Sequence, residues 1–371
     1  MKILHLTLEF PPQIGGIANY VINFAAHTPA NETVVYAPFE KNAATVDSSL
    51  PFKVYRHKPY WFLWPHWLRM LAQVYKIVKK EGVTKIYVHQ VLPGGYIAAA
   101  IKKLLKIPYV LFFHGTDLDR ALASNPKKKR LVSLVATADE VVVNSRFLED
   151  KLRKNIAVTC PVRVLFPAPA DYFFNSIDPL SGRKLKAQLA LQGKKVLLSV
   201  GRMVPGKGFA TLARLLPRVL EEFPDVVWIA IGEGSERQKV LDTVTKTDVQ
   251  HVCRFLGAVP SRDLPPLYQV ADIFILLTGE GGVGEEGWGT VFAEAAASGI
   301  PVIAGKSGGT TEIVQDKKTG LLVNAGSDEE ILTALRELLL TPEYAAGLGQ
   351  AGKALVAGNL TWAKQLEKFS L

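Results

Sequence analysis

Two cations stand in a glycine-rich loop in the second half of the chain, where they could hold an anion. Arg202 and Lys207 follow an apolar run at residues 195–200, and Gly201 and Gly208 lie directly beside them. Arginine offers a planar fork of donors, lysine a mobile point charge, and a following helix would add the partial positive charge of its N-terminus. This combination favours binding of a diphosphate over two unrelated surface charges.

Two glutamates further along the chain could accept hydrogen bonds from hydroxyl groups. Glu286 and Glu294 are separated by seven residues, and the glycines between them disfavour a helix until about Thr290. We therefore expect Glu286 in a loop and Glu294 on the first turns of a helix. A carboxylate can accept two hydrogen bonds from vicinal hydroxyls, which suits a sugar ring and a ribose. The backbone N–H groups from Gly289 to Val291 would face the phosphates. The alternative is two unrelated surface glutamates.

The first half of the chain offers weaker signals at the ends of its apolar runs. Gly15 and Gly16 permit a tight turn and close backbone approach to a ligand, although an ordinary strand-to-helix turn explains them as well. His114 follows the apolar run 109–113 and could hydrogen-bond a sugar hydroxyl or a reaction centre. The alternative is a structural histidine with satisfied hydrogen bonds.

Polar residues near His114 have structural alternatives too. Asp117 and Asp119 form a D-x-D pattern, which binds a metal in some transferases, but such a short pattern is common by chance and we predict no metal site. Asn144 or Ser145 is well placed to cap a helix, and capping alone could explain both.

Composition indicates a folded protein of two domains. The chain has 371 residues, of which 48% are hydrophobic and 21% charged. It has no apolar stretch of the roughly 18 residues that a membrane helix requires. Its beginning resembles a first strand rather than a signal peptide, because Glu9 and Pro11 interrupt the apolar run. Cys160 and Cys253 lie far apart, so a reduced, cytoplasmic compartment is the simpler interpretation.

Short apolar runs alternate with helix-length segments through both halves, a pattern typical of an α/β, doubly wound fold that occurs twice. We expect domains at residues 1–170 and 194–358, a linker near 167–193, and a C-terminal helix within 359–371 that packs on the first domain. Ligands of such folds bind at the carboxyl ends of the strands, which would here meet in a cleft between the domains. The expected strands cover residues 2–8, 33–38, 85–90, 109–115, 140–145, 162–166, 195–201, 226–232, 252–257, 273–279, 301–305 and 320–324.

The order of these motifs resembles that of the GT-B glycosyltransferases of family 4, over almost the whole chain. The shared features are a GG loop, a HG strand end, a GR…KG loop, an E-x7-E motif, and SG-x-PV followed by GG-x-x-E. The stretches 9–17, 199–208 and 286–309 look most like the phosphatidylinositol mannoside mannosyltransferases of the PimB type. The motifs stand here as Gly15-Gly16, His114-Gly115, Gly201-Arg202 with Lys207-Gly208, Glu286 to Glu294, Ser298 to Val302, and Gly308 to Glu312.

The resemblance implies roles for these residues. Arg202 and Lys207 would hold the donor diphosphate, Glu294 the ribose, Glu286 the hydroxyls of the transferred sugar, and His114 the sugar near its sixth carbon. His114, Glu286, Arg202 and Lys207 would form the catalytic set. The implied acceptor contacts are Asn19, Asp117 and Asn144, and the implied donor contacts are Gly15, Gly16, Gly201, Arg202, Lys207, Gly232, Gly257, Gly287, Trp288, Gly289, Thr290, Val291 and Glu294.

The same resemblance implies transfer with retention of anomeric configuration and without a metal or other cofactor. Whether retention proceeds through a same-face reaction or a double displacement is disputed for the family, and the lack of an evident nucleophile favours the same-face route. Two segments depart from the family pattern: Pro167 to Asp171 replaces a P-N-G-V-D stretch, and Glu280 and Glu285 add negative charge beside Glu286.

Charge is concentrated in the first half of the chain. Residues 1–167 carry 23 Lys and Arg against 11 Asp and Glu, whereas the rest carries 21 against 23. Residues 60–80 combine tryptophans with cations, and residues 127–130 are all basic, which favours an anionic membrane surface. Core aromatics with a solvated basic face would explain the segment as well. No nucleic-acid motif is present, so we predict no nucleic-acid partner. The tryptophans and neighbouring aromatic residue are Trp61, Phe62, Trp64 and Trp67.

The resemblance to the PimB type, taken with these features, implies a hexosyltransferase that moves mannose from GDP-mannose to a lipid-linked or cell-envelope glycan acceptor, in the cytoplasm or at the inner face of the cell membrane. A UDP-sugar donor is an open alternative. A nucleotide-sugar 2-epimerase shares the fold but needs no acceptor. A non-catalytic partner in glycan assembly is a third possibility, against which Arg202, Lys207, Glu286 and Glu294 argue.

Overall fold

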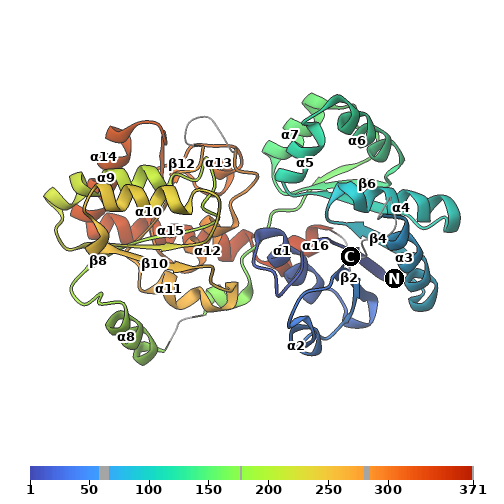
Figure 1. Cartoon of the computed structure of the whole chain (residues 1–371), viewed down its shortest axis with the longest axis horizontal. Helices are drawn as coiled ribbons and strands as arrows, with labels where there is room; N and C mark the ends of the chain where they lie inside the picture. Colours follow the sequence, from blue (N-terminus) through green and yellow to red (C-terminus); the bar gives the residue numbers. More distant parts are fainter. Residues whose placement is uncertain (58–66, 176–177, 280–284, 370–371) are drawn as a thin grey trace. The chain divides into compact units, whose positions relative to one another are not determined.

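A computed structural model of the chain describes residues 1–57, 67–175, 178–279 and 285–369. It divides into two compact units: residues 1–167 with 362–371, and residues 168–361. Each unit contains one parallel β-sheet with helices along the chain between its strands (Figure 1). The structure confirms the α/β, doubly wound class that the alternation of apolar runs predicts.

The first unit contains a seven-stranded sheet in the order β3-β2-β1-β4-β5-β6-β7. The register pairs Ile3 of β1 with Thr33 of β2 on one side and with Lys85 of β4 on the other. The strands are β1 (Ile3–Leu6), β2 (Thr33–Pro38), β3 (Lys53–His57), β4 (Lys85–Val88), β5 (Tyr109–Phe113), β6 (Glu140–Val143) and β7 (Val162–Val164). The helices are α1 (Gly16–Ala26), η1 (Ala30–Glu32), α2 (Ala43–Ser48), α3 (Trp67–Glu81), α4 (Val91–Leu105), α5 (Thr116–Leu122), α6 (Asn125–Thr137), α7 (Arg146–Asn155) and α16 (Trp362–Phe369).

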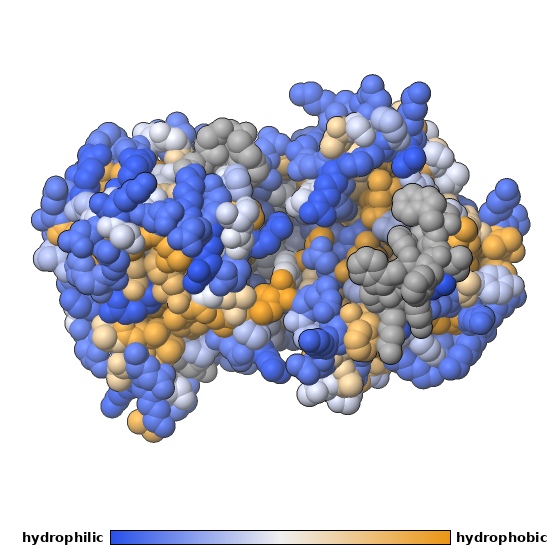
Figure 2. All heavy atoms as spheres, viewed as in Figure 1, coloured by the Kyte–Doolittle hydropathy of each residue, from blue (hydrophilic) through white to orange (hydrophobic). Residues whose placement is uncertain are grey.

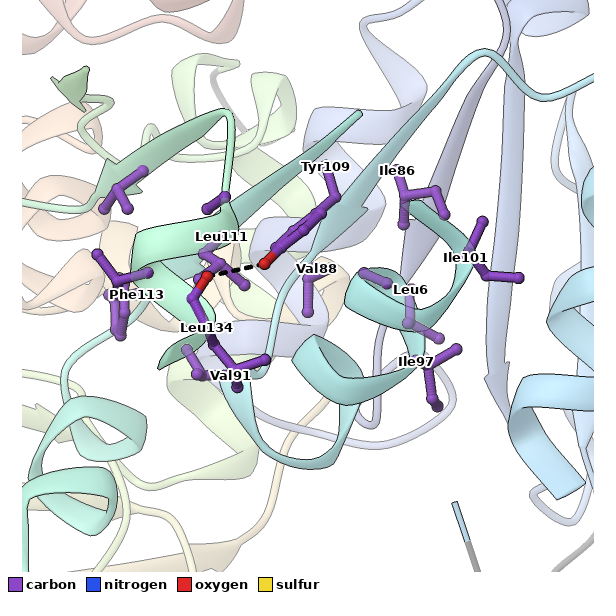
Figure 3. Close-up of a cluster of buried hydrophobic side chains, with 14 of the residues drawn as sticks. Leu6, Ile86, Val88, Val91, Ile97, Ile101, Tyr109, Leu111, Phe113 and Leu134 are labelled. Carbon is purple, nitrogen blue, oxygen red and sulfur yellow. Dashed lines mark hydrogen bonds between the residues drawn. The ribbon is translucent and has the colours of Figure 1, made fainter. Parts of the chain in front are cut away.

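The core of the first unit lies between the sheet and the helices that cover it. Every residue of β5 is buried, as a strand covered on both faces requires. Figure 3 shows aliphatic side chains of β1, β4 and α4 gathered beside the ring of Tyr109, whose hydroxyl donates a 2.7 Å hydrogen bond to the carbonyl of Leu134 in α6. The polar end of this buried tyrosine is thereby satisfied.

The C-terminal helix α16 belongs to the first unit, although 194 residues of the second unit precede it. Trp362 is 1% exposed, and its ring lies 5.1 Å from that of Tyr20 and 6.0 Å from that of Phe24 in α1. The side-chain oxygen of Gln365 accepts a hydrogen bond from the backbone of Phe166. These contacts hold α16 beside α1 (Figure 1).

The second unit contains a six-stranded sheet in the order β10-β9-β8-β11-β12-β13, with all pairs parallel. The segment expected as a linker, near residues 167–193, contains the helix α8. The strands are β8 (Lys195–Val200), β9 (Val226–Ile231), β10 (Cys253–Gly257), β11 (Ile273–Leu276), β12 (Val302–Gly305) and β13 (Leu321–Val323). The helices are η2 (Asp171–Phe174), α8 (Pro179–Gln188), α9 (Phe209–Glu222), α10 (Arg237–Lys246), η3 (Gln250–Val252), η4 (Ser261–Asp263), α11 (Pro265–Gln269), α12 (Thr290–Ala297), α13 (Thr310–Ile313), α14 (Asp328–Leu340) and α15 (Pro342–Asn359).

No described helix is both long enough and apolar enough to cross a membrane. On the face shown in Figure 2, hydrophilic residues cover most of both units, and hydrophobic residues are exposed in smaller areas.

Candidate active site

The loop between β8 and α9 carries both expected phosphate-binding cations, but their surroundings differ. Arg202 is exposed, and the described residues provide its guanidinium with no ion pair. Lys207 is mostly buried and forms an ion pair with Glu286. Gly208, the N-cap residue of α9, is in the left-handed conformation, and a Cβ there would lie 2.4 Å from the Cβ of Leu277. Glycine is therefore required directly after Lys207.

Glu286 lies in the loop before α12, as the glycines around it predict. The Gly308-Gly309 pair, in the loop between β12 and α13, supports this position. Gly309 donates a 2.8 Å backbone hydrogen bond to the carbonyl of Glu286. A Cβ on Gly308 would lie 2.2 Å from that same carbonyl oxygen, and one on Gly309 would lie 2.4 Å from that of Gly287. The two loops can approach this closely only because residues 308 and 309 are glycines without side chains.

Helix α12 begins at Thr290, where the sequence predicts it, after Gly289 in the left-handed conformation at φ 88°. Its first turn leaves backbone N–H groups without helical partners, which is the feature expected to face phosphates. Thr290 and Val291 are partly exposed at this end, whereas the side chain of Trp288 is only 3% exposed and belongs to the core.

Glu294, on the second turn of α12, is a buried carboxyl with an exposure of 4%. Burial raises its pKa to about 8, and a hydrogen bond from the hydroxyl of Tyr268 opposes part of that rise. The donor is 2.9 Å from Oε2 of Glu294. Tyr268 was not among the residues expected from sequence, because its apolar surroundings in α11 resemble those of any core tyrosine.

Three glycines expected to contact the donor lie at the ends of neighbouring strands β8, β9 and β10. Gly232 donates a 2.8 Å hydrogen bond to the carbonyl of Gly257, and a Cβ on Gly232 would lie 1.8 Å from the carbonyl oxygen of Gly201. Close packing of the backbone therefore accounts for Gly232 directly.

In the first unit, His114 and Asn144 lie together at the ends of the neighbouring strands β5 and β6. The amide Nδ2 of Asn144 donates to Nδ1 of His114 across 3.0 Å, and Nε2 of His114 is enclosed without a hydrogen-bond partner among the described residues. The backbone N–H of His114 donates to Oδ1 of Asp117 across 2.9 Å. Burial raises the pKa of Asp117 to about 7, although several backbone hydrogen bonds lower it. Ser145, not Asn144, caps α7 by accepting from the N–H of Leu148.

Behind His114 lie two further histidines that sequence reasoning missed. Nδ1 of His5 in β1 and Nε2 of His89, directly after β4, share a 3.0 Å hydrogen bond, and both residues are 0% exposed. The ring of His89 stacks at 5.7 Å on that of His114, and Tyr20 of α1 approaches His114 edge-on at 4.8 Å. Burial lowers the pKa of His5 and of His114 to about 3, and that of His89 well below its usual value. The signal that could have revealed His89 is its position, which repeats that of His114 one strand away.

The Gly15-Gly16 loop is held from the edge of the same sheet. Arg56 of β3 donates 2.6 Å hydrogen bonds from Nη2 to the carbonyl of Pro11 and to Oδ1 of Asp47. Helix α1 begins at Gly16, where a Cβ would have no heavy atom within 4 Å. The backbone of Asn19 closes the first turn onto Gly15.

The D-x-D pair has other partners. Asp117 bonds to the backbone of its own turn, and Asp119 forms a 2.7 Å ion pair with Lys151 of α7. Among the described residues, no three His, Cys, Asp or Glu side chains are grouped so that they could hold a metal ion.

Known families match both units. The profile described as Glycosyltransferase Family 4 matches residues 14–168, and that described as Glycosyl transferases group 1 matches residues 182–355. The fold and these matches define a glycosyltransferase of the GT-B class. The chain is a glycosyltransferase with a Glycosyltransferase Family 4 domain in its first half and a group 1 domain in its second half, and the resemblance stated from its motifs is confirmed.

Individual relatives agree with this assignment. The chain is 27% identical over 368 residues to a GDP-mannose-dependent alpha-(1-6)-phosphatidylinositol monomannoside mannosyltransferase of Mycolicibacterium smegmatis, covering 97% of this chain and 95% of that protein. It is 28% identical to the enzyme of Corynebacterium glutamicum described as acting on the monoacylated form, covering 97% and 94%. Among solved structures, HepE of Anabaena in complex with UDP and glucose has a TM-score of 0.85 at 20% identity, covering 100% of this chain and 98% of HepE.

Proposed function

We propose that this glycosyltransferase transfers mannose from GDP-mannose to a lipid-linked or cell-envelope glycan acceptor, with retention of configuration and without a metal. The similarity over nearly the full length to mannosyltransferases that use GDP-mannose and a phosphatidylinositol mannoside supports this donor and this class of acceptor.

One observation carries the proposal: the ion pair between Lys207 and Glu286, with the exposed Arg202 in the same loop as Lys207. The two loops that bear these residues follow β8 and β11, which are neighbours in the sheet. A cation and a carboxylate therefore meet at the carboxyl ends of these two strands. A sugar diphosphate presents the complementary pair of groups, because its phosphates need cations and its sugar hydroxyls need acceptors.

In the proposed reaction, a hydroxyl oxygen of the acceptor forms a bond to the anomeric carbon on the face that the diphosphate leaves. The bond from that carbon to the diphosphate oxygen breaks, and the departing diphosphate takes the proton of the acceptor hydroxyl. Arg202, Lys207 and the N-terminus of α12 stabilise the negative charge that develops on the diphosphate. Glu286 orients the transferred sugar, Glu294 the ribose, and His114 with Asn144 and Asp117 the hydroxyls met by the first unit.

We further propose that the first unit contacts an anionic membrane surface. On α3, Leu68 is 48% and Tyr75 39% exposed, and Lys76, Lys79 and Lys80 are exposed on the same helix. Apolar side chains next to lysines suit an interface with anionic lipid. The opposite side of α3, through Met70, Val74 and Ile77, packs in the core. Trp61, Phe62 and Trp64 lie outside the described residues.

Calorimetric titration with GDP, UDP, GDP-mannose and UDP-glucose, each with and without EDTA, tests the donor and the metal independence. We expect guanine nucleotides to bind with an affinity that EDTA does not change. A preference for UDP would contradict mannose as the proposed sugar. Loss of binding in EDTA would contradict metal independence, and the absence of binding by all four ligands would contradict a catalytic function. The Glu286→Ala variant should transfer no sugar, whereas a non-catalytic partner would be unaffected by this change.

Two companion assays test the rest of the proposal. Anomeric configuration of the product, followed by NMR with a lipid-linked mannoside acceptor, distinguishes retention from inversion. Conversion of the nucleotide sugar to its 2-epimer in the absence of acceptor would instead support an epimerase. Sedimentation with vesicles of anionic and of neutral lipid tests the membrane contact.

A further inference from the structure

The hydroxyl of Tyr268 holds one oxygen of the buried carboxyl of Glu294. It donates to Oε2 across 2.9 Å, and the two residues are 0% and 4% exposed. Tyr268 comes from α11 and Glu294 from α12, 26 residues later, with β11 between them. The contact is therefore made by the fold of the unit rather than by one local turn.

Two aromatic side chains fix the ring of Tyr268. Phe274 of β11 stacks on it, with ring centroids 5.6 Å apart and planes at 24°, and Phe173 of η2 meets it edge-on at 5.6 Å. A tyrosine held on a face and an edge has little freedom to turn, so the position of its hydroxyl oxygen is fixed. That oxygen lies 2.9 Å from Oε2 of Glu294 and 3.5 Å from the carbonyl oxygen of Val291, so Glu294 is the nearer acceptor. The shorter hydrogen bond ties Oε2 of Glu294 to this fixed oxygen.

The arrangement leaves the other oxygen of Glu294 for a ligand. Within the described residues, Oε1 has no hydrogen-bond partner, and a carboxyl group keeps acceptor capacity whether or not it is protonated. Burial raises the pKa of Tyr268 well above its usual value, so its hydroxyl remains a donor at any physiological pH. A buried carboxyl with one oxygen occupied and oriented can be specific for a neighbouring hydroxyl group, since a ligand without that hydroxyl leaves a buried polar atom unpaired.

We propose that Tyr268 is a positioning residue for the ribose of the donor. By occupying Oε2, it directs Oε1 of Glu294 toward the ribose hydroxyls and makes the site selective for a ribonucleotide. This inference rests on the proposed function, in which Glu294 binds the ribose of a nucleotide sugar.

The test uses Tyr268→Phe in the full chain, which keeps the ring and removes the hydroxyl. GDP and UDP are each titrated beside their 2′,3′-dideoxy counterparts, and the ratio of affinities reports recognition of the ribose hydroxyls. We expect the unchanged chain to prefer the ribonucleotide by about tenfold or more, and Tyr268→Phe to reduce that ratio to near one. The affinity for the dideoxy nucleotide should change little, which a general loss of structure would not spare.

A matched control is Tyr172→Phe. Tyr172 belongs to the same aromatic group, with its ring 5.1 Å from that of Phe173, but its hydroxyl donates to Oγ of Ser261 across 2.9 Å. The control removes one hydrogen-bonded, partly buried hydroxyl and should leave the ribose preference unchanged. An equal loss of preference in Tyr172→Phe would overturn the inference, because packing alone would then explain the effect.

Glu294→Gln provides a second measurement that does not depend on the folding of Tyr268→Phe. The preference for the ribonucleotide should fall by a similar factor, and the double variant should lose no more than either single one, as expected for residues that act as a unit. Additive losses of the ribonucleotide preference in the double variant would overturn this inference but not the proposed function. A folded Tyr268→Phe variant with an unchanged preference would do the same. Failure of the unchanged chain to bind GDP or UDP would overturn the proposed function and the inference with it.

Discussion

Lys207, in the loop after β8, forms an ion pair with Glu286, in the loop before α12, although the two residues are 79 positions apart in the sequence. Both side chains are mostly buried, at 19% and 16% exposure, so water screens their attraction less than at an open surface. If Lys207 holds the donor diphosphate, the pair has to open or to share its cation when the donor binds. Binding of the donor phosphates to Lys207 would then release the carboxylate of Glu286, which is the group proposed to bind the sugar of the donor.

Removal of the charge at Lys207 should weaken nucleotide binding. We expect Lys207→Met to lower the affinity for GDP by about 10- to 100-fold, because one charge-assisted hydrogen bond to phosphate is lost. Calorimetry measures the change, with Lys239→Met as the control, since Lys239 pairs with Glu236 and its side chain is 62% exposed. Equal affinities for Lys207→Met and the unchanged chain would refute the proposed role.

Glu286→Gln should separate binding from transfer. The variant removes a negative charge next to Lys207, so the affinity for GDP should stay the same or rise by severalfold. The rate of transfer should fall by about 100-fold or more, because an amide cannot accept two hydrogen bonds from the sugar through charged oxygens. Binding and transfer that fall together would show that Glu286 acts on the structure of the loop instead.

Much of the fold could be predicted from the sequence. The structure places strands at all twelve of the apolar runs, because parallel strands buried on both faces produce runs that stand out from their surroundings. The one remaining described strand, β3, was not among the expected strands. Lys53, Arg56 and His57 interrupt its apolar residues, and its position at the sheet edge leaves all five of its residues at least partly exposed.

The candidate site could be predicted only in part, because sequence spacing reveals loops better than contacts across the fold. The glycine pattern predicted the start of α12 and the loop position of Glu286. The contact of Tyr268 with Glu294 depends on how α11 packs beside α12, and that of His5 with His89 depends on strand order. Neither arrangement leaves a pattern along the chain.

Glu294 should make the stability of the protein depend on pH. Burial raises its folded pKa to about 8, above the ordinary value of 4.5, so the folded state holds a proton that the unfolded state releases. The free energy of unfolding therefore falls as pH rises from about 4.5 to about 8. Glu294→Gln removes this contribution, and its gain in melting temperature over the unchanged chain should be larger at pH 8.5 than at pH 5.

Differential scanning calorimetry at the two pH values measures that gain, which we expect to reach at least about 2 °C at pH 8.5. Glu337→Gln on α14 is the control, because Glu337 is exposed and should change the melting temperature little at either pH. An equal gain at both pH values would show that Glu294 is ionised in the folded protein throughout this range.

His5, His89 and His114 in the first unit should have the opposite dependence. Burial lowers the pKa of His5 and of His114 to about 3 and that of His89 well below its usual value, so each imidazole is neutral in the folded protein. The unfolded chain takes up protons at these residues below about pH 6.5, and the stability of the first unit should fall as pH drops below that value. Nitrogen-15 NMR should detect no titration of these three rings between pH 5 and 8.

The tautomer of His114 can be tested in the same spectra. Because the amide of Asn144 donates to Nδ1, the proton of His114 should reside on Nε2. Asn144→Ala removes that donor, and we expect the Nδ1–H tautomer of His114 to become populated while the signals of His5 and His89 keep their positions. The variant should also transfer sugar more slowly, if His114 contacts the substrate as proposed. A titration midpoint between pH 5 and 8 for any of the three, or an unchanged His114 tautomer in Asn144→Ala, would contradict this account of the first unit.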